Sequence, residues 1–107
     1  MQNIIETKDL ITFEADFPKL AIGNNLYPVN DLKSTADKID EVFADEKLKQ
    51  KEKEIKILEL ALGEEATKEL MGKNMSVKSY RNLVQLVMAT IQGMTLKEFQ
   101  DQLNGKN

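Results

Sequence analysis

The side chains of this chain that could do chemistry are carboxylates, lysines, hydroxyls and tyrosines, because the sequence contains no histidine and no cysteine. This composition excludes disulfides, thiol nucleophiles, histidine acid–base catalysis and zinc sites built from Cys or His. Asp37 and Glu41 are four residues apart, so a helix would bring them to one face. Such a pair could bind Mg²⁺ or divide acid and base roles. Because the same spacing is common on solvated helix faces, we expect no metal site here.

Other candidate chemistry is equally sparse. Ser34, Ser76 and Ser79 have no histidine to activate them, and the glycines do not follow the spacing of a phosphate-binding loop. We therefore predict a protein that is not an enzyme, with no catalytic residue and no bound cofactor or metal.

Charge is unevenly distributed along the 107 residues, although the formal net charge is only −3. Residues 1–45 contain nine acidic and four basic side chains, whereas residues 46–56 contain three acidic and five basic ones. The basic side chains of this second stretch are Lys47, Lys49, Lys51, Lys53 and Lys56. They alternate with glutamates and lack interleaved aromatics, which makes a poor surface for phosphates. We expect no nucleic-acid partner.

Signals for export or membrane insertion are not visible. The first nine residues, MQNIIETKD, have neither a basic start nor a long apolar stretch. Uninterrupted apolar runs are only a few residues long, far short of the roughly 18–20 residues that cross a bilayer. We expect a cytoplasmic protein with no membrane partner.

The first secondary-structure elements that the sequence indicates are short runs rich in strand-forming residues. Residues 10–13 and 20–22 are apolar and rich in strand formers, and the triplet 23–25 is typical of a turn. Residues 26–29 resemble a further strand, which Pro28 restricts to an edge position. The pattern predicts an antiparallel hairpin or a three-stranded meander.

After residue 30 the apolar period changes from 2 to 3.6, which predicts helices. The first helix, capped by Asp31 or Ser34, presents one apolar stripe made of Leu32, Ala36, Ile39 and Phe43. Further helices are expected at residues 46–62, 64–71, 76–92 and 95–103, the last two capped by Ser76 and Thr95. The main stripe of the expected central core helix is Val77, Tyr80, Val84, Val87 and Ile91.

Together these patterns predict one α+β domain over residues 1–107. Its strand region spans residues 1–30, and a bundle of four to five helices spans residues 31–103. Residues 104–107 are expected to fray.

The order of elements resembles the tail assembly chaperones of long-tailed bacteriophages, or prophages, of Gram-positive bacteria. The stretches that carry the resemblance are GNNLYPV (23–29), LELALGEEATKELM (58–71), SYRNLVQLVMATIQG (79–93) and TLKEFQ (95–100). They describe a leucine-rich helix ending in Leu-Gly, a short helix, a long apolar helix ending in Gly, and a final capped helix.

This resemblance implies a non-enzymatic protein that binds the long tape measure protein while tail tube subunits polymerise around it. The tail tube protein is then a second expected partner, and self-association is expected as well. The alternative function is a small cytosolic protein–protein interaction or regulatory domain of another kind. For either function, the residues expected to contact a partner are Leu26, Tyr27, Ile57, Leu60, Leu86 and Met88.

Overall fold

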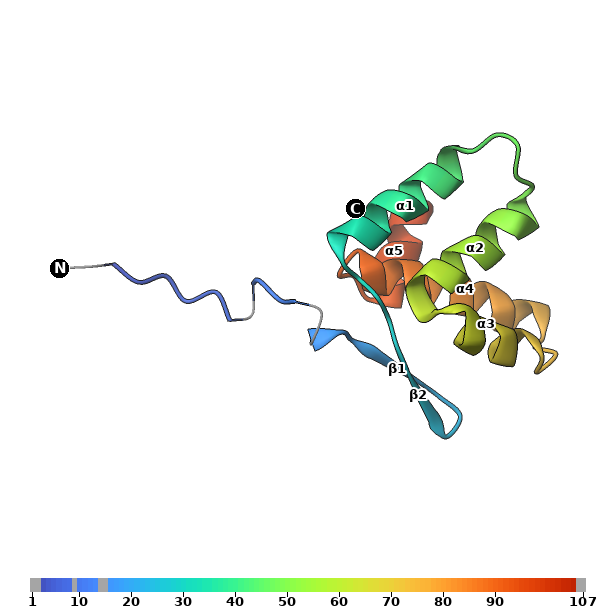
Figure 1. The fold of residues 1–107 in the computed structure, drawn as a ribbon, viewed down its shortest axis with the longest axis horizontal. Helices are drawn as coiled ribbons and strands as arrows, with labels where there is room; N and C mark the ends of the chain where they lie inside the picture. The colour runs from blue at the N-terminus through green and yellow to red at the C-terminus, as the bar shows by residue number, and fades with distance from the viewer. Residues whose placement is uncertain (1–2, 9, 14–15, 106–107) are drawn as a thin grey trace.

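The computed structural model describes residues 3–8, 10–13 and 16–105. A two-stranded hairpin precedes five helices, which confirms the α+β class (Figure 1). The elements are β1 (Lys19–Ile22), β2 (Asn25–Pro28), α1 (Lys33–Ala44), α2 (Gln50–Leu62), α3 (Glu64–Met71), α4 (Val77–Ile91) and α5 (Leu96–Leu103). None of the helices in these described ranges is both long enough and apolar enough to cross a membrane.

The hairpin forms where the turn triplet predicts it. β1 and β2 are antiparallel, with Leu20 opposite Tyr27 and Ile22 opposite Asn25. Gly23 begins the two-residue loop with a φ of 60°, a conformation that favours glycine at the first position of a type II′ turn. Leu20 and Ile22 share the inner face of β1 and pack against the core, so strand alternation attaches the hairpin to the helices.

The third strand expected at residues 10–13 is not formed. This segment instead follows a turn in which the backbone N–H groups of Leu10 and Ile11 donate to the carbonyl of Thr7, at 2.8 and 2.9 Å. The sheet contains only β1 and β2 among the described residues. Strand propensity cannot form a strand without a hydrogen-bonded neighbour, and here none is present.

The core is formed by the hairpin region and the helices α2, α3 and α4. α2 packs against α1, α3 and α4, and α4 packs against α5. The buried core residues are Tyr27, Val29, Leu58, Ala61, Leu70, Leu83, Val84 and Val87. α4 supplies Leu83, Val84 and Val87 to this core, but α2 packs against more helices than α4 does, and Val77, at 75% exposed, lies outside the core. Val77 is the first residue of α4 and lines a hollow together with Gln50 and Glu54 of α2.

Two helix starts differ from expectation. α2 begins at Gln50 instead of Glu46, because the preceding residues form a turn in which Asp45 Oδ1 accepts a hydrogen bond from the N–H of Lys47 at 2.9 Å. α1 begins at Lys33 without a side-chain cap from Asp31 or Ser34. Instead, Asn30 Oδ1 accepts a hydrogen bond from the N–H of Leu32 at 3.2 Å.

The ends of the later helices agree better with the sequence. Ser76 Oγ accepts a hydrogen bond from the N–H of Ser79 at 3.1 Å. Thr95 and Glu98 form the expected capping box, with hydrogen bonds of 3.1 and 3.0 Å. In the expected frayed tail, the N–H of Asn104 still donates to the carbonyl of Gln100, and residues 106–107 lie outside the described residues.

A segment that we call the N-terminal arm, residues 3–18, precedes the hairpin. Its described residues, 3–8, 10–13 and 16–18, lead away from the helices (Figure 1). The radius of gyration is accordingly 15.7 Å, whereas a compact chain of this length would have about 13 Å. The arm therefore contributes little to the core.

Candidate partner-binding surface

The carboxylate pair Asp37 and Glu41 lies on an exposed face of α1. Asp37 Oδ2 lies 3.0 Å from Lys33 Nζ, and both of these side chains are largely exposed. Across residues 3–8, 10–13 and 16–105 no cluster of three or more potential metal-ligating side chains occurs. The carboxylates of α1 thus belong to a solvated helix face.

The two tyrosines serve as ties between elements. The hydroxyl of Tyr27 on β2 donates to Glu69 on α3 at 2.8 Å, and the hydroxyl of Tyr80 on α4 donates to Glu54 on α2 at 2.9 Å. The hydrogen bond to Glu69 raises the pKa of Tyr27, and burial together with the bond to Glu54 raises the pKa of Tyr80 to about 12. Both hydroxyls therefore stay protonated at neutral pH and act as donors, not as nucleophiles.

An apolar hollow of about 350 Å³ lies beside α4, and we call it the apolar groove. Its lining comes from β1, α3, the α3–α4 connection, α4 and α5, and consists of Ile22, Leu70, Met75, Ser79, Asn82, Leu83, Leu86 and Leu96. None of these side chains is charged. Four other hollows among the described residues each include at least one charged side chain.

Local sequence explains how the groove is built. Leu70 and Leu83 are 1% and 6% exposed, so the base of the groove belongs to the core. Ile22, Leu86 and Leu96 are half-buried and line it nearer to solvent. The caps that begin α4 and α5 fix where these two helices start, and thus where their apolar side chains meet. The groove can accept an apolar side chain or a helix face.

Two of the expected contact residues are corrected by the structure. Ile57, on α2, is 1% exposed, and Tyr27, on β2, is 6% exposed. α2 is apolar on several sides because α1, α3 and α4 all pack against it, so its apolar surface is used within the domain. Tyr27 points inward by strand alternation. Neither side chain is accessible to a partner in the folded chain.

The remaining four expected residues lie on separate surfaces. Leu86 lies in the apolar groove, and Leu26 is 64% exposed on the hairpin. Leu60 is half-buried in a hollow formed by α1 and α2, whereas Met88 lies in hollows that also include residues of α1 or α5. Of the six expected residues, only Leu86 contributes to the groove.

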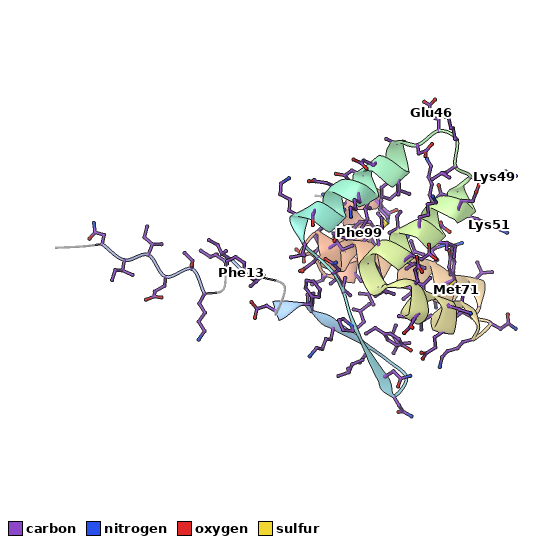
Figure 2. All side chains as sticks on the ribbon, viewed as in Figure 1. Phe13, Glu46, Lys49, Lys51, Met71 and Phe99 are labelled. Carbon is purple, nitrogen blue, oxygen red and sulfur yellow. The ribbon has the colours of Figure 1, made fainter. Side chains whose placement is uncertain are left out.

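Sequence reasoning missed the exposure of the N-terminal arm. Five of its large apolar side chains are 56–80% exposed, whereas Phe17 is half-buried; the five are Ile4, Ile5, Leu10, Ile11 and Phe13. Figure 2 shows Phe13 at a distance from the helices, while Lys49 and Lys51 lie at the opposite end of the body. Apolar residues stand next to each other at 4–5 and 10–11, instead of alternating with polar ones. This spacing was the available signal that the segment does not form a strand with one buried face.

Groove residues outside α4 were also missed. Ile22, Met75 and Leu96 come from three different parts of the chain, and only tertiary packing brings them beside Leu86. Comparisons of the whole chain with protein-family models, with curated proteins and with solved structures find no match.

Proposed function

We propose that this protein is a non-enzymatic phage tail assembly chaperone. It binds the tape measure protein in the host cytoplasm and keeps that long chain soluble and ready for assembly while tail tube subunits assemble around it. The proposal starts from the resemblance in the order and ends of the helices.

The observation that carries the proposal is the apolar groove. Leu86 and Leu96 remain accessible there, next to a base that is already part of the rigid core. An amphipathic helix docks into such a groove through residues spaced three or four apart. A tape measure protein, as a long and aggregation-prone chain, supplies many such apolar faces.

The charge of the lining supports a partner recognised mainly by apolar contact. Ser79 and Asn82 are the polar side chains of the groove, and both are neutral. Contact with a neutral, apolar surface depends on shape and burial instead of on one specific charge pattern. This is suited to a chaperone that must bind many segments of one partner.

Co-expression with the tape measure protein tests the proposal. We expect the wild-type chain to keep that protein in the soluble fraction and Leu86→Gln to lose most of this effect. Leu60→Gln is the matched control, because Leu60 is also a half-buried helical leucine but lies in the hollow of α1 and α2. Far-UV circular dichroism of both variants checks that they fold.

The result also separates the two candidate functions. A soluble tape measure protein that depends on Leu86 and not on Leu60 supports the chaperone function. If the wild-type chain leaves the tape measure protein insoluble, the chaperone proposal fails, and the groove belongs to an interaction or regulatory domain with another partner.

A further inference from the structure

We propose that the apolar groove of one copy accepts the N-terminal arm of a second copy. This inference goes beyond the proposed function, because it concerns the protein alone and needs no tape measure protein. It joins the two apolar surfaces that the fold leaves open, the groove and the arm.

The arm carries exposed apolar side chains that could fill such a groove. Five of the nine large hydrophobic side chains that are exposed among the described residues lie on the arm, between Ile4 and Phe13. Leu10, Ile11 and Phe13 fall within four consecutive positions and are 79%, 56% and 73% exposed. Exposed apolar side chains gathered this closely mark an interaction site more often than single ones do.

Charge favours the same pairing. In sequence the arm contains four acids, Glu6, Asp9, Glu14 and Asp16, against the single base Lys8, a net charge of −3. Residues 70–97, which supply most of the groove, contain four bases and no acid. These bases are Lys73, Lys78, Arg81 and Lys97, and all four are exposed.

The basic side chains lie beside the groove and not within it. Lys78 and Arg81 line a neighbouring hollow, which shares Asn82 with the apolar groove. Lys97 directly follows Leu96, a residue of the lining. An arm with apolar side chains in the groove would therefore have basic side chains close to its acids, an arrangement that also aligns partners as they approach.

The basic stretch 46–56 is a weaker match for the arm. Its lysines alternate with Glu52 and Glu54. It contains only two large apolar residues, Leu48 and Ile55, and both are half-buried. The groove beside α4 offers an uncharged apolar lining, and residues 70–97 contain no acid, although Glu69 directly precedes Leu70. We therefore assign the arm to the groove.

The length of the arm permits contact with a neighbouring copy. From Ile4 to Pro18 an extended chain spans up to about 46–50 Å. The molecule measures 33 and 26 Å along its two shorter axes. In Figure 1 the arm leads away from its own helices, so its apolar residues are presented to another molecule.

Light scattering coupled to size-exclusion chromatography tests the pairing on the full chain over a dilution series. The wild-type chain is expected to exceed the monomer mass of 12.2 kDa as its concentration rises. The arm variant Ile11→Asp/Phe13→Asp and the groove variant Leu86→Asp are each expected to remain monomeric. An equal mixture of the two variants should associate again, because one intact arm then meets one intact groove.

A charge variant keeps the test decisive if Leu86→Asp does not fold by circular dichroism. Lys78→Glu/Lys97→Glu changes two exposed side chains, and we expect it to weaken association at least several-fold at low salt and less at high salt. In that case its mixture with the arm variant replaces the mixing experiment, and stronger association than either variant shows alone is expected.

Three results would overturn the inference. The first is a wild-type chain that stays monomeric at every concentration, which would also be the result if the arm folded back on its own groove. The second is an arm variant that associates as the wild type does. The third is a mixture of folded arm and groove variants that remains monomeric. None of these results bears on whether the tape measure protein is bound.

Discussion

Leu58→Ala should be one of the most destabilising single truncations in this chain. Leu58 on α2 is 0% exposed and belongs to the core cluster with Leu83 and Val87. Losing its isopropyl group costs about 2.4 kcal/mol of transfer free energy at about 0.8 kcal/mol per carbon. The cavity left behind adds to this, so we expect the free energy of unfolding to fall by about 3–5 kcal/mol.

Leu26→Ala is the matched control, because the same atoms are removed from a side chain that is 64% exposed. Only about a third of the transfer free energy is lost there, and no closed cavity forms. We therefore expect the free energy of unfolding to fall by less than about 1 kcal/mol.

Urea unfolding followed by far-UV circular dichroism measures both values. At the urea slope of about 1–3 kcal/mol/M that is usual for a small domain, the Leu58→Ala midpoint should fall by at least about 1 M relative to wild type. Equal losses at the two positions, or a loss below about 1 kcal/mol at Leu58, would refute the assignment of Leu58 to the core.

Two further predictions use the same unfolding assay. Gly63 has a φ of 92°, so Gly63→Ala should lower stability by about 1–3 kcal/mol, whereas Gly72→Ala, at a φ of −72°, should raise it by about 0.4–1 kcal/mol. Equal effects at the two glycines would contradict the backbone argument. Folding raises the pKa of Tyr80 from 10.0 to about 12. The stabilisation of the folded state by the protonated Tyr80 hydroxyl is therefore complete below pH 10 and is lost as the pH rises to 12. Tyr80→Phe should therefore flatten the fall of stability over this alkaline range, and an unchanged slope would contradict the burial of this hydroxyl.

Local signals predicted the helices and the hairpin well. Ser76 and the Thr95 capping box mark the starts of α4 and α5, and α3 has the bounds expected from the sequence. Such caps depend on residues within one turn of each other, so the sequence contains all the information that they require.

Features that depend on distant contacts were predicted less well. Residues 10–13 have strand propensity, but a strand also needs a partner, and β1 pairs with β2 alone among the described residues. Ile57 was expected at a surface because α2 is apolar on several sides. The sequence could not show that three neighbouring helices cover those sides.

The candidate surface was predicted only in part, through Leu86. The groove needs Ile22 and Leu96 to meet Leu86, and these residues are 64 and 10 positions away from it in the sequence. No periodicity within one element can indicate such a meeting. The exposed arm was overlooked for a related reason, since apolar residues predict burial only when the fold supplies something to cover them.

In the proposed function, the apolar groove is the surface that binds the tape measure protein. The most direct measurement is an amide ¹H–¹⁵N NMR titration of the full chain with a soluble helical segment of that protein. We predict the largest shift changes at groove positions, including Ile22, Met75, Leu86 and Leu96, with little change around Leu60. No saturable shift changes, or changes centred on α1 and the start of α2, would contradict the claim.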